Sequence, residues 1–376
     1  MAISPKIYGK SQYSIGIKHK SGDAFSTPAA VGTTYQLLPV INVSAPVLNL
    51  VESGEIRSNN AGMIETNLDQ FRTRKGGFVT MDFEVPAERE AVVRLLANVL
   101  QDHSQTGSGP YVHTIQATSG SPLTRPDFTV ADDAASADAD GIPSLFDIGL
   151  FGPAGVSEDK LITSAVLQTL TMNFDMSDGR LLLSGSFYSG FASDSGFKVG
   201  QNITGNSEAP DLMHTSPSQI ESYFDTKKLD VNGSATDAVI TAVSFTFENN
   251  VARAGRDSNG DAEAYAFGIP SVNITGEISV MYDGNFNDSA DNVLQDFISG
   301  TPATLTLKQG DGTVSTAGEM NIEAEIYSTA VNYDFNADTG AVITIPFKVV
   351  QPTSSGAVSG TAFSFVYADN KTYTGW

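Results

Sequence analysis

The chain of 376 residues is long enough to bury two hydrophobic cores of ordinary size. Its formal net charge of −22 at pH 7 excludes a protein that wraps nucleic acid, because phosphate binding needs clustered Lys and Arg. The absence of cysteine excludes disulfide scaffolds, thiolate catalysis and cysteine-ligated zinc. Such acidity either keeps the protein soluble or lets DNA pass without sticking.

Residues 1–34 have the composition of an arm rather than of a core, because Gly, Ser and Pro interrupt any hydrophobic period. A basic arm on an acidic chain favours docking onto a neighbouring subunit, although a frayed terminus would look the same. We find no apolar stretch typical of a signal peptide or a membrane span, so we expect folding in a cytoplasm. The arm's candidate contact residues are Lys6, Lys10, Lys18 and Lys20.

One pentapeptide occurs twice and is followed both times by a similar longer sequence, which indicates an internal duplication. The pentapeptide NVLQD stands at 98–102 and again at 292–296, each time expected to close an amphipathic helix. NFDMSDGRLLLSGSF begins at Asn173 and NYDFNADTGAVITIPF at Asn332; both have a turn containing Asp and Gly before an apolar run, and the first predicts a hairpin. We therefore expect a first unit over residues 35–205 and a second over 206–376.

In the first unit, strands are predicted at 35–43 and 46–56, followed by a long polar loop over 57–76. Apolar and polar residues then alternate from Val79 to Val85, which is typical of a strand with one buried face. Pro86 is well placed to open a helix, whose apolar stripe is Val92, Leu95, Leu96 and Val99 and whose outer face is Glu88, Arg89, Glu90 and Arg94.

An acidic segment over about 117–160 interrupts this pattern with Asp among Ala, Ser and Gly. We expect an exposed insertion, because so little apolar surface cannot fold alone. Strand alternation returns at Leu170, Met172 and Phe174, before the Asp178-Gly179 turn.

The second unit repeats the order of elements. Strands are predicted at 239–247 and 272–280, on either side of a polar loop over 249–270. A helix N-cap is expected between Asp288 and Asp291, and Gly300 with Pro302 ends that helix. Further strands are expected at 303–308, 319–328, 342–350 and 361–368.

No residue pattern predicts catalysis, a cofactor or a metal. The histidines His19, His103, His113 and His214 are scattered and are expected at surfaces or strand ends. The run from Asp257 to Glu263 alternates oxygen ligands, but its Gly is at the fourth position instead of the sixth and no acid occupies the twelfth. We therefore expect an acidic turn there and no enzyme activity.

The chain resembles the tail tube proteins of long-tailed bacteriophages over roughly residues 35–350. The resemblance rests on ESGEIRS at 52–58, GGFVTMDFEV at 76–85, the segment 161–187, ITAVSFTFENNV at 240–251 and VNITGEISVMYDG at 272–284. It implies a mainly β fold with two tandem β-sandwich or half-barrel tube domains, each flanked by one α-helix. It also implies rings that stack into a hollow tube for double-stranded DNA, as a structural part of the virion tail.

Roles for particular residues follow from this resemblance as expectations. Two units per chain suggest trimeric rings with pseudo-sixfold symmetry where single-unit relatives need a hexamer. Partners would be further copies, the tail's terminator, baseplate or tip and tape measure proteins, and passing DNA that is not bound specifically. The inter-ring contact candidates are Arg57, Arg72, Arg74, Lys75, Arg253 and Arg256, and the candidates for an electronegative lumen are Asp82, Glu84 and Glu277.

Two alternatives stay open. A secreted β-rich adhesin would share the Gly, Ser and Thr content but should carry a signal sequence. Another virion component, such as a decoration protein, would share the fold class. An enzyme fits least, because no coherent site is present.

Overall fold

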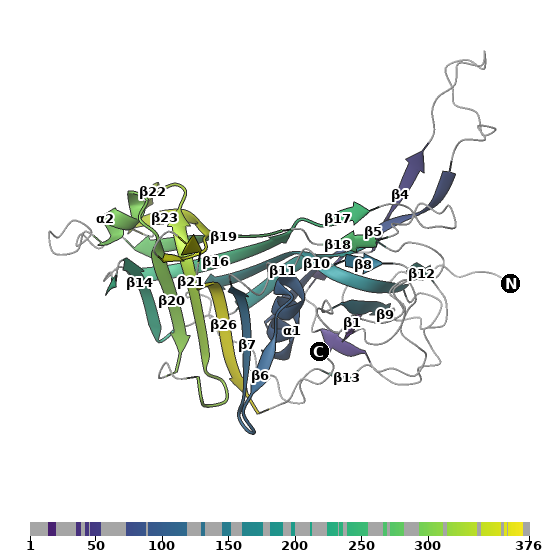
Figure 1. Cartoon of the computed structure of the whole chain (residues 1–376), viewed down its shortest axis with the longest axis horizontal. Coiled ribbons are helices and arrows are strands. Elements are labelled where there is room, and N and C mark those ends of the chain that lie inside the picture. The colour runs from purple at the N-terminus through teal and green to yellow at the C-terminus, as the bar shows by residue number, and fades with distance from the viewer. Residues whose placement is uncertain are drawn as a thin grey trace, which may run out of the picture.

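The protein is mainly β and builds one large antiparallel strand network, with two helices among the residues described (Figure 1). The computed structural model describes residues 14–19, 35–38, 42–44, 46–53, 73–87, 89–118, 129–131, 145–151, 160–175, 181–190, 197–199, 211–212, 224–231, 233–235, 239–254, 266–268, 271–281, 293–310, 314–336, 340–354, 357–358 and 360–370.

The strand network contains a long layer that we call the inner sheet. Its pairings run from β4 at one end to β22 at the other, within the described residues, and the short β3 (Asn42–Val43) continues β4 along β5. In spatial order its strands are β4 (Val47–Ser53), β5 (Thr73–Pro86), β11 (Leu181–Ser189), β10 (Lys160–Asp175), β16 (Val239–Asn249), β19 (Val272–Met281), β23 (Gly340–Val349) and β22 (Asn332–Asn336).

A second layer, the outer sheet, is joined to the inner sheet by the pairing of β21 with β23. In order it contains β14 (Thr226–Val231), β20 (Ala303–Gln309), β21 (Met320–Ser328), β26 (Thr361–Asp369), β7 (Tyr111–Thr118) and β6 (Ser104–Thr106), with β15 (Ser234–Ala235) at the end of β14.

The first half of β10 also belongs to a smaller lateral sheet. Its other strands are β12 (Phe197–Val199), β9 (Phe146–Phe151), β1 (Ser14–His19), β2 (Gln36–Leu38) and β13 (Asp211–Leu212). Two small sheets complete the assignment: β17 (Ala252–Ala254) with β18 (Ala266–Gly268) and β8 (Thr129–Ala131), and β24 (Thr353–Ser354) with β25 (Ala357–Val358).

The strand order of the inner sheet repeats. The group β4-β5-β11-β10 is followed by β16-β19-β23-β22, and in both groups the last two strands form a hairpin. A helix follows the second strand of each group: α1 (Arg89–Leu100) after β5 and α2 (Val293–Ile298) after β19. This repeated order supports the internal duplication, whereas the division into domains at residue 205 stays a prediction.

The repeated pentapeptide is a poorer guide than the strands. Its first copy closes α1, as expected, but the described part of its second copy, residues 293–296, begins α2, which continues to Ile298. The expectation that both copies close a helix is therefore wrong for the second. The expected N-cap between residues 288 and 291 lies outside the described residues.

The two groups meet where β10 pairs with β16, and we call this contact the internal joint. On the side that faces the hydrophobic core, Leu170 lies opposite Phe247 and Met172 lies opposite Phe245. All four side chains are fully buried. The ring of Phe245 contacts Phe363 of β26 edge-on, with centroids 5.5 Å apart. Because β26 pairs with both β7 and β21, the outer sheet also links the two halves of the chain.

Helix α1 is enclosed rather than laid on a surface. It contacts β10, β16 and β7 and lies between the two layers (Figure 1). All described side chains from Ala91 to Leu100 are buried, including Arg94, which is 4% exposed. The expectation that Arg94 lies on a wet outer face is therefore wrong, because strands cover more than the apolar stripe.

The basic arm and the acidic insertion are also less separate than expected. Ile15 and Ile17 of β1 are buried, and β1 pairs with β9, which is formed from residues of the insertion. Leu145 to Leu150 are all buried as well. Both segments are expected outside the core from their composition, but the structure pairs β1 with β9 and β9 with β10.

Two asparagines hold the backbone at an irregularity next to the internal joint. The β10–β11 register shifts between Leu167 and Thr169. Oδ1 of Asn98 in α1 accepts a hydrogen bond from the Leu167 N–H at 2.7 Å, and Nδ2 of Asn249 in β16 donates one to the Leu167 carbonyl at 2.7 Å. Both asparagines are buried, so the two bonds fix β10 between α1 and the second half of the chain.

We expect Asn249→Ala to lower the free energy of unfolding by about 1–3 kcal/mol, because it removes the donor to a buried carbonyl. Asn250→Ala is the matched control: its side chain is exposed, and its bond to Ser271 Oγ is 2.8 Å long at the surface. Urea denaturation of both variants measures the difference. Equal losses would contradict a structural role for the Asn249 amide.

Two histidines that the sequence left scattered come together beneath α1. The rings of His103 and His113 stack with centroids 5.5 Å apart, and Nε2 of His103 lies 3.2 Å from Nδ1 of His113. His113 is fully buried, so it is not the surface residue that we expected. Burial, then the nearby His113 and Arg94, lower the pKa of His103 to about 4.

This lowered pKa predicts a pH dependence of stability. Between pH about 6.5 and about 4 the unfolded chain binds a proton at His103 and the folded chain does not, so the free energy of unfolding falls as the pH falls. In His103→Gln this contribution should be absent. Urea denaturation at several pH values tests the expectation; identical slopes in both proteins would refute it.

Candidate functional site: the polar face of the inner sheet

The inner sheet has one buried and one wet side because its strands alternate in the same phase. In β5 the side chains of Val79, Met81, Phe83 and Val85 are buried, whereas Asp82 is exposed. The paired strands continue this division: Ser184, Thr171, Thr246 and Thr275 lie in one cross-strand row with Glu84. We call this wet side, opposite the core, the polar face.

The charges of the polar face are mostly negative. Its described carboxylates are Asp82, Glu84, Asp175, Glu248, Glu277 and Asp334. Two of them have neutral cross-strand neighbours on both sides: Glu277 lies between Ser244 and Pro346, and Glu248 between Thr169 and Asn273. The described residues directly opposite Glu248 and Glu277 are therefore uncharged.

The described cation of this face lies near its far end. Lys348 of β23 is opposite Thr275 and Tyr327, and its Nζ lies 5.4 Å from the centroid of the Tyr327 ring. A cation over an aromatic face is held by the ring's quadrupole. Lys348 is thus turned toward an aromatic side chain of β21.

Hydroxyl groups tie neighbouring strands together across this face. Thr169 Oγ1 lies 2.9 Å from Ser186 Oγ, and Thr171 Oγ1 lies 3.2 Å from Thr246 Oγ1 across the internal joint. Hydrogen bonds between such side chains fix the surface and occupy part of its hydrogen-bonding capacity. The polar face is therefore a sheet surface of hydroxyl groups and carboxylates.

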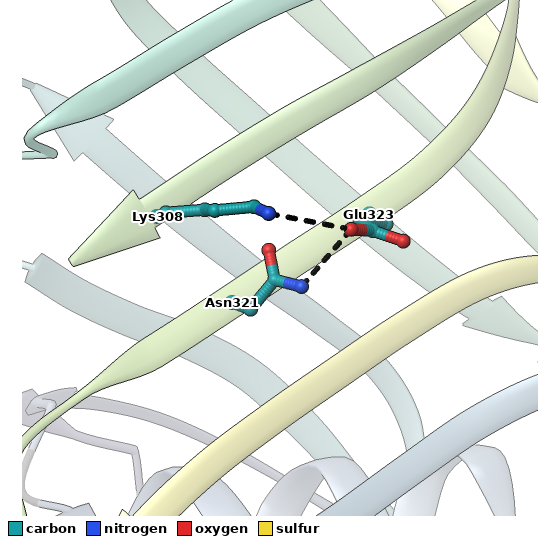
Figure 2. Close-up of polar contacts among 3 residues, drawn as sticks. All are labelled: Lys308, Asn321 and Glu323. Atoms are coloured by element: carbon teal, nitrogen blue, oxygen red, sulfur yellow. Dashed lines mark hydrogen bonds and ion pairs between the residues drawn. The ribbon is translucent and has the colours of Figure 1, made fainter. Parts of the chain in front are cut away.

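The outward side of the outer sheet carries a different arrangement. Lys308 of β20 approaches Glu323 of β21, with 4.0 Å between Nζ and Oε1, and Asn321 donates to the same oxygen at 3.0 Å (Figure 2). Glu325 accepts a hydrogen bond from Thr304 at 2.9 Å. Two acids on this side therefore have described partners, and for Glu323 one of these is a cation.

The arrangement is suited to passive contact with a polyanion. Carboxylates repel phosphates over about a Debye length, ~8 Å at physiological salt, and hydroxyls keep the surface hydrated. Within the described residues, no group of three or more potential metal ligands comes together. Nor does any described helix have the length and hydrophobicity to cross a membrane.

A two-stranded ribbon extends from one edge of the inner sheet. β11 pairs with β5 only from Val79 onward, while β4 continues along β5 to Thr73. The ribbon projects beyond the other strands (Figure 1). An isolated two-stranded ribbon is marginally stable in water, so this one is suited to binding a partner.

The structure places the predicted contact residues only in part. Arg74 and Lys75 lie in β5 on the ribbon and not in a loop, and Arg253 lies in β17. Lys18 is half-buried in β1. The candidates outside the described residues are Arg57, Arg72, Arg256, Lys6, Lys10 and Lys20, together with the acidic run from 257 to 263.

The predicted lumen residues are brought together on one face. Asp82 and Glu277 are exposed and Glu84 is half-buried, all on the polar face. Sequence reasoning missed Glu248 and Asp175, although both continue the polar phase of strands that had been recognised. The alternation of polar and apolar residues along these strands could have identified both acids. Whether these residues line a lumen stays a prediction.

Comparisons with known proteins add little to this geometry. No protein family matches the sequence, and no curated protein matches it. Among solved structures, the chain is similar to the SPP1 tail tube, in a hybrid structure from solid-state NMR and cryo-electron microscopy, at 13% identity and a TM-score of 0.25. The similarity covers 40% of this chain and 78% of that one.

If the acids of the polar face serve function and not folding, replacing them should cost little. We expect Glu277→Gln to change the free energy of unfolding by less than about 0.5 kcal/mol, as for ordinary surface substitutions. Ile278→Ala, at the adjacent buried position, should cost about 2–5 kcal/mol. Urea denaturation compares them, and a large loss in Glu277→Gln would show a structural role.

Proposed function

We propose that this protein is a structural subunit of a bacteriophage tail tube, in which stacked rings surround a lumen for double-stranded DNA. The observation that carries the proposal is the polar face: a continuous sheet surface with carboxylates and hydroxyls on one side and the core on the other. Such a wall suits a channel through which a polyanion must move without binding.

The repeated strand order supports a ring of few copies. A trimer would contain the four-strand motif six times and so have pseudo-sixfold symmetry. Its inner wall would contain roughly two dozen strands, more than the 16–18 that already leave an aqueous channel in β-barrels. In this arrangement the core and the outer sheet face away from the lumen, and the polar face lines it.

The β4–β5 ribbon is suited to contact between successive rings. Identical rings stacked head to tail use a heterologous contact that repeats without closing, so the tube can grow. Arg74 and Lys75 lie on the ribbon strand β5, and a basic segment on an acidic protein favours docking onto the next copy. The predicted terminator, tip and tape measure partners would act at the tube's ends and interior.

The mechanism is mechanical and electrostatic rather than catalytic, and the proposal requires no cofactor or metal. DNA carries one negative charge per ~1.7 Å of helix axis, so any cationic lining would retain it by releasing counterions. An acidic lining makes no such contacts. Passage then depends on the driving pressure and not on release from binding sites.

The first test is assembly. Negative-stain electron microscopy of the purified protein should show annuli or tubes with a central channel. If only featureless monomers are seen, even at protein concentrations high enough for subunits to associate, the proposal is overturned. Particles of another shape would favour the alternative of a different virion component.

The second test concerns the lumen. Replacing Glu84, Glu248 and Glu277 by Lys should give tubes that retain double-stranded DNA inside, protected from nuclease, with retention lost as salt is raised. The matched control replaces Asp230, Glu323 and Glu325 of the outer sheet by Lys. DNA bound by those control tubes should stay sensitive to nuclease. Protection in the control alone would place the wrong face in the channel.

A further inference from the structure

The chain contains within itself one example of how its two halves meet. Strand β10 ends the first group of the inner sheet and β16 begins the second, and they pair from Thr169–Glu248 to Asp175–Ala242. β22 ends the second group in the same way, and β3 with β4 begins the first. The terminal strands of the described sheet are thus the same two kinds of strand that the internal joint brings together.

We propose that β22 of one copy pairs with the β3–β4 edge of a second copy, in the register of the internal joint, and that this contact also covers α2. That this pairing closes into a ring rests on the proposed function. The pairing itself defines the surface through which neighbouring copies make contact. The partner is a second copy of this chain.

Exposed apolar side chains mark both edges. Val47 of β4 is 53% exposed and Tyr333 of β22 is 56% exposed, two of the largest values for described large apolar residues. By strand pairing, Tyr333 is equivalent to Met172, which is fully buried in the internal joint. The same position is therefore covered where a following group is present and exposed where the chain supplies none.

The two helices also differ in how far they are buried. α1 contacts β16, the first strand of the following group, and its described side chains are buried. In α2, Phe297 is buried but Gln295 and Asp296 are exposed. A second copy placed as β16 is placed would bring its β3–β4 edge toward α2, which lies at the β22 end of the molecule (Figure 1).

The register follows from pairings on the two sides. Phe187 and Phe347 end the repeated hairpin sequence and lie opposite Met81 and Gly276. Thr80 is then equivalent to Thr275, and their partners Val47 and Thr246 are equivalent to each other.

The same anchor makes Leu183 equivalent to Ile343. Their partners Met172 and Tyr333 therefore correspond, and Thr171 corresponds to Asn332. The sequence pattern aligns Asn173 with Asn332, whereas the strand pairing aligns Asn332 with Thr171, two residues earlier.

Thr171 pairs with Thr246 in the internal joint. The equivalent pair between copies is Asn332 with Val47, both on the polar face and both exposed. Four residues farther along the strands, Asp175 pairs with Ala242, which predicts that Asn336 lies opposite Asn42. The polar face would then continue from one copy to the next without a break.

Because the chain has no cysteine, cysteine cross-linking tests this register directly. Asn332→Cys and Val47→Cys, prepared as separate single variants and mixed, should form a disulfide-linked dimer on mild oxidation. Directly opposed residues of an antiparallel pair have Cβ atoms ~4.5–5.5 Å apart, close to what a disulfide needs. A single chain carrying both changes should give a ladder that stops at the ring size.

The matched control mixes Asn332→Cys with Asn42→Cys. Asn42 is also exposed on the same edge, but the register places it about four residues away, ~13 Å along the strand. We expect roughly tenfold less dimer than from the predicted pair, since a disulfide cannot span that distance. Equal or greater yield from the control would overturn the register.

A second variant tests the contact without cysteine chemistry. Tyr333→Asp should fold normally, because the side chain is exposed, but should lose self-association measured by sedimentation. Unchanged association would overturn the role of β22.

The outcomes separate this inference from the proposed function. Tubes seen by microscopy without cross-linking of the predicted pair would leave the tube proposal standing and refute this contact. Cross-linked closed rings that never stack would support the contact and refute the tube.

Discussion

The pairing of β10 with β16 is the contact on which the rest of the structure depends. It merges two strand groups into one sheet, buries Phe245 and Phe247 against the outer layer, and continues the polar face across the middle of the molecule. An exposed strand edge is a liability because its backbone groups can template association. The joint removes two such edges within the chain, and the remaining ends of the sheet are the same kinds of strand.

Much of the fold was predictable where the signal was local. Alternation from Val79 to Val85 correctly divided β5 into a buried and a wet side, and the first hairpin sequence correctly marked β10–β11. The turn before β23 was also expected, but no strand was predicted at β22. This alternation placed Asp82 and Glu84 on one side of β5 and Glu277 on the polar side of β19, whereas their common face follows from the strand pairings. A period of two is decided by the pleat of a single strand, so it needs no knowledge of distant partners.

Several failures involve contacts between elements, which the pattern within one element does not contain. Arg94 is buried because β7 and β16 close around α1, and His103 meets His113 because β7 folds back beneath the helix. Ile15 and Phe146 enter the core only because β1 and β9 pair with each other. Composition described these segments individually as basic, acidic or polar. Their burial is a property of the pairing, which no window of sequence contains.

A duplicated chain changes the energetics of assembly as well as its symmetry. Joining two units covalently makes one joint intramolecular, with a high effective concentration and no loss of translational freedom when it forms. The two halves can also diverge: α1 is enclosed and long, α2 is short with exposed Gln295 and Asp296, and β8 of the first half pairs with β18 of the second. Six identical subunits would have to accept every change six times. In a chain with two units, one half can specialise in internal packing while the other keeps the surface that a second copy would bind.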